Sequence, residues 1–194
     1  MANNDEILIA EVKKAVEVLR NGGIILYPTD TVWGIGCDAT NSESVAKIYA
    51  IKHREDSKSM LVLCDSMAKV SLYVNHIPDI AYDLTELSEK PMTIIYPDAK
   101  NLASNLIASD GSVGIRVTTE KFSKYLCGAF GKPIVSTSAN ISGEPAAACF
   151  SEISEQIKGS VDYIVSYRQD DTEKKQPSSI IKLEKNGIFA LLRK

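Results

Sequence analysis

The chain has 194 residues, of which 44% are hydrophobic and 24% charged, a composition typical of folded proteins that excludes a fibrous or disordered chain. Its formal net charge of −3 excludes a global basic field that would hold a nucleic acid through counterion release alone. No basic region followed by an apolar run opens the chain, and no stretch approaches the roughly 18 consecutive apolar residues of a membrane span. We expect one domain, residues 1–194, located in the cytosol without membrane contact.

Helices and strands alternate through the first third of the chain. Residues 6–20 place apolar side chains at helical spacing, and the glycines after residue 21 supply a stop. The apolar run 24–27 predicts a buried strand that ends before Pro28. Asn41 is a suitable N-cap for a helix over 42–52, and the run 60–64 predicts the next strand.

The remainder continues in the same way. Further helices are expected at 66–74, 78–88, 120–130 and 151–158, and further strands at 93–97, 113–117, 133–137, 161–167, 179–183 and 188–192. The polar segment 168–177 is a candidate lid. This alternation predicts a single-domain α/β fold with a mixed sheet, flanking helices and an antiparallel hairpin at the end.

Several common motifs are absent or out of context. Residues 34–39 match the GxGxxA dinucleotide fingerprint, but the predicted helix opens later, after Asn41, so a Rossmann turn is rejected. The chain has no P-loop and no GxSxG elbow. Its cysteines form no CxxC pair, so we expect no zinc or other metal held by the protein itself and mostly buried, reduced thiols. These cysteines are Cys37, Cys64, Cys127 and Cys149.

Positive charge gathers where the helix 42–52 ends. Lys52, His53 and Arg54 are followed closely by Lys58. Lysine supplies a point charge and arginine a planar fork that holds two oxygens, a combination that suits a polyphosphate. The same residues could instead complement the helix macrodipole.

A second cluster of small polar residues follows the apolar start of the strand 133–137. Residues 136–140 read Ser-Thr-Ser-Ala-Asn. Hydroxyls and an amide can donate to phosphate or ribose oxygens, while the small side chains admit a ligand close to the backbone. The alternative is a capped turn, which favours the same residue types.

Two further segments are candidates for binding. Residues 27–34 place hydroxyls after a buried strand, although Trp33 is expected in the core. Arg116 interrupts an apolar strand, so it must leave the core or find an anionic partner. That partner would be a substrate carboxylate or a structural aspartate.

Together these segments resemble the YrdC-type family, the threonylcarbamoyl-adenylate synthases. The family's KxR and SxN pairs correspond to Lys52-His53-Arg54 and Ser138-Ala139-Asn140, and four blocks follow in the family's order: GGIILYPTDTVWGIGCDA, GSVGIRV, STSANISGEP and QPSSII. The resemblance implies a twisted α/β fold with a large concave pocket. This sequence departs from the family at Glu55 and in the block that holds Thr137, where the family often has proline, and at residues 89–91, where it often has a Gly-Pro turn.

The resemblance also implies an activity and a set of site residues. The enzyme would be a nucleotidyltransferase that makes threonylcarbamoyl-AMP and pyrophosphate from ATP, threonine and bicarbonate, with Mg²⁺ accompanying ATP. Its product would pass to the machinery that makes threonylcarbamoyladenosine in tRNA, with possible tRNA contact. The implied ATP-binding residues are Lys52, Arg54, Lys58, Ser112, Ser138, Asn140 and Arg193, of which Lys52, Arg54, Ser138 and Asn140 are also the catalytic set. The implied threonine-binding residues are Thr31, Arg116, Ser136 and Ser178.

Two alternatives stay open. A YciO-type paralogue would share the fold without synthase activity, although such paralogues lack an intact set of both pairs. An RNA-binding module would use the same basic cluster for a phosphodiester, which the net charge disfavours. An RNA groove would also have no need of the threonine-pocket residues.

Overall fold

A computed structural model describes residues 4–54, 60–173, 175 and 177–193. Its strands are β1 (Ile25–Tyr27), β2 (Gly34–Gly36), β3 (Leu61–Cys64), β4 (Met92–Tyr96), β5 (Val113–Val117), β6 (Ile134–Ser138), β7 (Tyr163–Ile164), β8 (Ser179–Leu183) and β9 (Phe189–Arg193). Its helices are α1 (Asn4–Arg20), α2 (Ser42–Ile51), α3 (Met67–Val70), α4 (Ile80–Leu87), α5 (Lys121–Phe130) and α6 (Glu155–Lys158), with short 3-10 turns η1 (Ser104–Leu106) and η2 (Phe150–Glu152).

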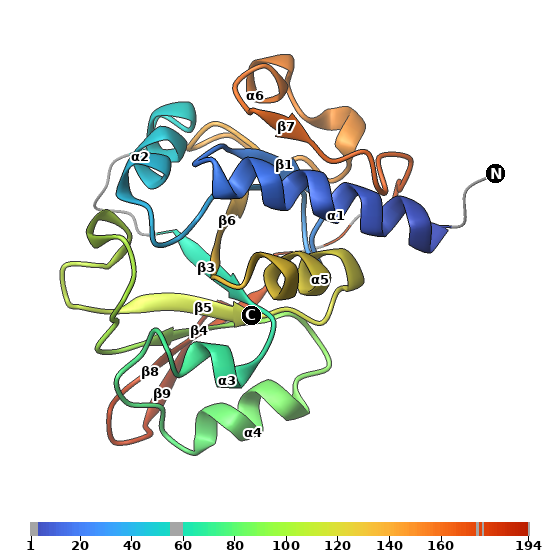
Figure 1. The fold of residues 1–194 in the computed structure, drawn as a ribbon. Helices are drawn as coiled ribbons and strands as arrows, with labels where there is room; N and C mark the ends of the chain where they lie inside the picture. The colour runs from blue at the N-terminus through green and yellow to red at the C-terminus, as the bar shows by residue number, and fades with distance from the viewer. Residues whose placement is uncertain (1–3, 55–59, 174, 176, 194) are drawn as a thin grey trace.

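The strands form one mixed sheet in the order β7-β1-β2-β6-β3-β5-β4-β8-β9. Parallel pairs join β1 to β7, β3 to β5 and β4 to β8. The other neighbours run antiparallel, including the predicted final hairpin of β8 and β9. The α/β class with a mixed sheet and flanking helices is therefore confirmed (Figure 1).

Alternation along the strands separates two apolar cores. Ile25 and Tyr27 pack on one face of the sheet, whereas Ile24 and Leu26 pack on the other. Successive side chains of a strand point to opposite faces. Helices α1 and α5, which lie next to each other in Figure 1, cover the first face, and α2, α3 and α4 contribute to the core on the second.

The expected helix boundaries have local causes. Helix α1 ends where Gly22 adopts a φ of 73°, a left-handed conformation that glycine reaches without steric cost. The side chain of Asn41 accepts hydrogen bonds from the amides of Glu43 and Ser44 at the start of α2. Because the helix begins at this cap and residues 34–36 form β2, the rejection of a Rossmann turn is confirmed.

Some elements are shorter than predicted. The strand expected over 161–167 pairs with β1 only through Tyr163 and Ile164, and the amide of Ser166 donates to Glu11 of α1 instead of to a strand. Strand β1 ends at Tyr27, because the next residue, Pro28, has no amide proton for a longer ladder. Helix α3 covers four residues of the predicted 66–74, and β2 was not expected as a strand because three residues carry too little pattern.

The described part of the chain contains no helix long and apolar enough to cross a membrane. All four cysteines are free thiols. Cys37, Cys64 and Cys127 are buried, and Cys149 is half-buried. The expectation of reduced, mostly buried thiols agrees with this arrangement.

Glu11 joins α1 to the chain beyond β7. Its carboxylate is 3% exposed and accepts hydrogen bonds from the Tyr163 hydroxyl and the Ser166 amide, each at 2.7 Å. Burial raises the pKa of this carboxyl, but the hydrogen bonds from Ser166, Tyr163 and Lys14 outweigh burial and lower it below 4.5. The ionised form therefore stabilises the fold.

We expect Glu11→Gln to lower the free energy of unfolding by about 1–3 kcal/mol at pH 7, because it removes the charge from a buried acceptor that serves two donors. The stabilisation is present above pH 4.5, the unfolded value, and is lost as pH falls through the folded pKa. Urea unfolding across this range should thus show the deficit shrinking in acid. Glu17→Gln, on the exposed face of α1, is the matched control. An equal deficit at every pH would contradict this assignment.

Candidate functional site

A cavity of about 470 Å³ lies over the sheet on the face that carries α1 and α5, beyond those helices. Its floor is formed by β2, β6, β3, β5, β4, β8 and β9, which are consecutive in the sheet. The lining residues from the strands include Gly34, Leu61, Thr93, Ile95, Gly114, Arg116, Ser136, Ser138, Ile180 and Arg193. Others, including Thr29, Thr31, Arg54, Ser112, Asn140, Glu144, Pro177 and Ser178, belong to connecting segments.

Strand pairing brings the floor residues together. Gly34 of β2 is paired with Ser138 of β6, and Leu61 of β3 is paired with Ser136. A Cβ at Gly34 would lie 3.2 Å from the Ser136 hydroxyl, so the absence of a side chain at Gly34 leaves space above this part of the sheet for a ligand. Strand β6 ends at Ser138, one residue beyond the predicted 133–137, so Ser136 and Ser138 both lie within it and project to the cavity face.

The end of α2 separates the two cations of the KxR pair. Lys52 is the C-cap of the helix, and His53 follows with a φ of 48°, a left-handed conformation that reverses the chain. The Arg54 amide donates back to the Tyr49 carbonyl at 3.0 Å. As a result, Arg54 lines the cavity while Lys52 does not.

Lys52 lies beneath the SxN segment. Its side chain is 1% exposed, and its Nζ donates to the carbonyl oxygens of Ser138 and Asn140 at 2.5 and 2.6 Å. The Ser142 amide in turn donates to the Lys52 carbonyl at 2.8 Å. Burial, and then the charge of Arg54, lowers the pKa of Lys52 to about 8. Lys52 thus joins the end of α2 to the end of β6.

Asn140 shapes the turn that follows. Its Nδ2 donates to the carbonyl oxygens of Ile141 and Glu144 at 3.0 and 2.7 Å. Its Oδ1 is buried and has no hydrogen-bond partner among the described residues. Since buried acceptors are normally paired, this oxygen is a position where a ligand donor would fit.

Arg116 has one of the two partners that the sequence left open, a structural aspartate, and keeps a donor for the other. Its Nη2 lies 3.1 Å from Asp30 Oδ1, which makes Asp30 a structural counterion. Its Nε is buried without a hydrogen-bond partner in the described part of the chain, although the side chain is 3% exposed and lines the cavity. A guanidinium in this state retains a donor for an anionic ligand.

Thr31 and Ser178 reach the cavity from two connecting segments. The Thr31 and Thr29 hydroxyls lie 3.1 Å apart, and the Ser178 hydroxyl lies 2.8 Å from that of Thr93. Arg193 Nε donates to the Ser178 carbonyl at 2.8 Å, with Nη2 3.4 Å from its hydroxyl. Ser178 is thus held from two strands.

The charge of the cavity differs from that of the whole chain. Its described lining contains three arginines, Arg54, Arg116 and Arg193, and one carboxylate, Glu144. Burial lowers the pKa of both Arg54 and Arg193, and Arg116 lowers that of Arg193 further. Three partly desolvated cations in one cavity favour a ligand with several negative charges.

Most of the predicted site residues meet in this cavity. Arg54, Ser112, Ser138, Asn140 and Arg193, as well as Thr31, Arg116, Ser136 and Ser178, line it. Lys52 supports it from below, and Lys58 lies outside the described residues. Their individual roles toward ATP and threonine stay predictions.

Thr93 was not predicted as a site residue, and Thr29 and Asp30 were included only as part of the candidate segment 27–34. Thr93 is a buried polar residue in an otherwise apolar strand, which is a signal that could have been used. Asp30 stands between two threonines just after β1, but nothing in the sequence pairs it with Arg116. The tertiary fold brings these two residues together, Asp30 in the turn after β1 and Arg116 in β5.

The family model described as Sua5/YciO/YrdC, "Telomere recombination", matches residues 17–194. The chain belongs to this family. A curated relative from Vibrio cholerae, named threonylcarbamoyl-AMP synthase, is 34% identical over 161 residues, which cover 81% of this chain and 86% of the relative. A second, from Pseudoalteromonas translucida and with the same name, is 35% identical over 157 residues, or 79% of this chain and 84% of the relative.

A solved structure shares the fold. The Sua5 of P. abyssi, solved in complex with L-threonine, superposes with a TM-score of 0.83 at 23% identity. The match covers all of this chain and 55% of the Sua5 chain. This chain therefore spans about half the length of that protein.

Proposed function

We propose that this protein is a threonylcarbamoyl-AMP synthase, which forms threonylcarbamoyl-AMP and pyrophosphate from ATP, L-threonine and bicarbonate. The observation that carries the proposal is the joining of three arginines with Ser136, Ser138 and Asn140 in one cavity. Membership of the family and the names of its curated relatives support it. By reaction class the enzyme would be a nucleotidyltransferase.

The chemistry requires positive charge more than a strong base. The threonine amine and bicarbonate first form a carbamate and water. A carbamate oxygen then attacks the α-phosphorus of ATP, the bond from that phosphorus to the bridging oxygen breaks, and pyrophosphate leaves. Because both reactants are anions, neutralisation and alignment by fixed donors would supply most of the rate acceleration.

The site residues divide between the two substrates. Arg54, Ser138 and Asn140 would contact the nucleotide, supported by Lys52, with Lys58, Ser112 and Arg193 as further candidates. Arg116 would receive the threonine carboxylate through its unpaired Nε, with Ser136 beside it on the floor. Thr31 and Ser178 would complete the amino-acid pocket. Arg193 contacts Ser178, so it lies at the edge of that pocket.

A magnesium ion accompanying ATP belongs to the proposal. Glu144 is the single carboxylate among the described lining residues, which fits an ion held mainly by phosphate oxygens and water, with one protein ligand. Such an ion would neutralise phosphate charge. The protein's own cations would act on the remaining oxygens.

The product is a reactive mixed anhydride and must be passed on. We place the enzyme in the cytosol, where it would supply the machinery that transfers the threonylcarbamoyl group to adenosine in tRNA. Direct contact with tRNA is part of this hypothesis, and the net charge of −3 means that such contact would depend on a local basic surface.

Release of pyrophosphate by the purified protein tests the function. We expect release from ATP to require both threonine and bicarbonate, and to fall at least tenfold when either is omitted. Release that is indifferent to threonine would refute the synthase. Binding of tRNA without any pyrophosphate release would favour the RNA-binding module, and inactivity of a folded, ATP-binding protein would favour the YciO-type alternative.

A further inference from the structure

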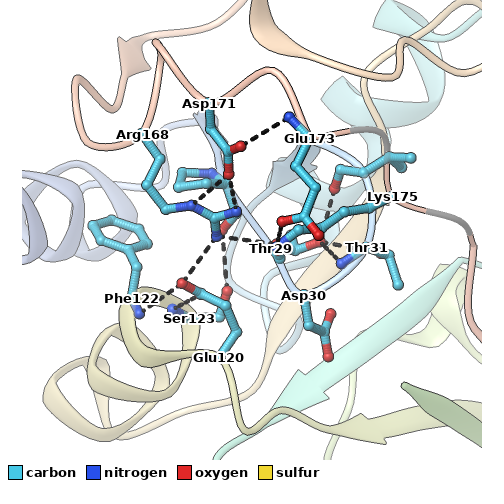
Figure 2. A network of polar contacts seen from close by, with 12 residues as sticks. Thr29, Asp30, Thr31, Glu120, Phe122, Ser123, Arg168, Asp171, Glu173 and Lys175 are labelled. Atoms are coloured by element: carbon cyan, nitrogen blue, oxygen red, sulfur yellow. Dashed lines mark hydrogen bonds and ion pairs between the residues drawn. The ribbon is translucent and has the colours of Figure 1, made fainter. Parts of the chain in front are cut away.

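Arg168 contacts three segments: its own loop at Asp171, the start of α5 at Glu120, and the turn after β1 at Thr29. Of these contacts, Thr29 lines the cavity. Arg168 lies in the chain that leads from β7 to Ser178 and has a φ of 64°. Its Nη2 and Nε contact Asp171 Oδ2 at 2.5 and 3.2 Å, and its Nη1 lies 3.2 Å from Glu120 Oε1 and 3.5 Å from the Thr29 carbonyl oxygen. Figure 2 shows the guanidinium between the two carboxylates.

Glu120 gives this contact a fixed anchor. It is the N-cap of α5, and its carboxylate accepts hydrogen bonds from the amides of Phe122 and Ser123 at 3.1 and 2.7 Å. The positive end of the helix dipole holds the carboxylate in place. The Ser123 hydroxyl also donates to the Pro28 carbonyl at 3.1 Å, so α5 contacts the start of the segment that Arg168 reaches.

The turn at residues 29–31 connects the Arg168 contacts to the cavity wall. The Thr29 hydroxyl accepts from the Thr31 amide at 3.0 Å and donates to the Val32 carbonyl at 2.7 Å. Thr29 and Thr31 line the cavity, and Asp30 between them holds Arg116. Arg168 itself does not line it. A shift of the Thr29 carbonyl would therefore displace both Thr31 and the counterion of Arg116.

We propose that Arg168 is a positioning residue for the amino-acid substrate, which fixes the 29–31 turn against the N-terminus of α5. The identity of that amino acid as threonine rests on the proposed function. The proposal assigns the charge network of Arg168, Glu120 and Asp171 a role in amino-acid affinity and none in ATP affinity. Among the described residues, Ser138 and Asn140, which would contact ATP, form side-chain hydrogen bonds with Lys52, Ile141 and Glu144 and not with this network.

The test compares Arg168→Met with Arg20→Met. Arg20 is exposed at the end of α1, where its Nη2 donates a long hydrogen bond of 3.4 Å to the Ala129 carbonyl. We expect Arg168→Met to raise the KM and the calorimetric Kd for threonine about tenfold, since small displacements of positioning groups have effects of this size. The Kd for ATP should stay within about twofold. Arg168→Lys, which retains the charge but not the fork, should recover part of the affinity.

Equal weakening of ATP and threonine binding, or no change in either, would overturn the proposal. Arg168→Lys carries the same test if Arg168→Met does not fold. Hydrogen exchange of the 29–32 amides without substrates gives a second readout, expected to accelerate in the Arg168 variants and not in Arg20→Met. Release of pyrophosphate by the wild-type protein without threonine would refute the proposed function. Unchanged hydrogen exchange of the 29–32 amides in the Arg168 variants would refute the positioning role alone.

Discussion

Arg116→Lys is expected to raise the KM for threonine about a hundredfold, while the Kd for ATP stays within about twofold. Lysine keeps a positive charge opposite Asp30, so no buried carboxylate is left uncompensated. It loses the planar fork whose Nε is the unpaired donor in the cavity. A charge-assisted hydrogen bond of this kind contributes about 1.5–3 kcal/mol, and 2.8 kcal/mol corresponds to about a hundredfold in affinity.

Steady-state pyrophosphate release at varied threonine measures this effect, with Arg20→Lys as the matched control on the surface. Arg116→Leu provides the contrast, because it leaves Asp30, whose side chain is 10% exposed, without its counterion. We expect that variant to lose about 3–5 kcal/mol of stability as well. A normal threonine KM in a folded Arg116→Lys protein would show that the carboxylate binds elsewhere.

Lys52→Met is expected to reduce turnover at least tenfold, about 1.4 kcal/mol of transition-state stabilisation, without removing any side chain from the cavity wall. The variant loses both donors to the Ser138 and Asn140 carbonyl oxygens. The segment that carries Ser138 and Asn140 then has no anchor to α2 through this side chain. Relief of a buried charge offsets part of the lost hydrogen bonding, so the change in melting temperature should be smaller than that in activity.

The pH dependence of the wild type separates Lys52 from the arginines. With its pKa lowered to about 8, Lys52 loses its charge as pH rises through 8, so the Kd for ATP should increase about tenfold between pH 7.5 and 9.5. Above pH 8 the unfolded chain binds more protons at this position than the native one, so stability should rise toward pH 10.5. Calorimetry and urea unfolding measure the two trends. Both pH trends, in the Kd for ATP and in stability, should be absent in Lys52→Met. If they persist in that variant, another titrating group causes them.

Local sequence patterns predicted the elements whose causes are local. Apolar runs located β1, β3 and β6, and Asn41 marked the start of α2, because a side-chain cap and a strand's burial are properties of neighbouring residues. Elements that depend on distant partners were predicted less well. Strand β7 pairs over two residues instead of seven, since Ser166 donates to Glu11 of α1.

By itself the sequence, through its resemblance to the family, determined the list of eleven candidate side chains, of which nine line the cavity, with Lys52 beneath it and Lys58 outside the described residues. The residues alone had marked Arg116, as a charge within an apolar strand, and the small polar cluster at residues 136–140. Tertiary structure alone decided how they act. It placed Thr93 beside Ser178 and Asp30 beside Arg116. The left-handed conformation of His53 reverses the chain, so that Lys52 lies beneath the segment of Ser138 and Asn140 while Arg54 lines the cavity. The physical reason is that a strand's alternation determines which side chains share a face, whereas hydrogen bonding between distant strands determines which faces meet.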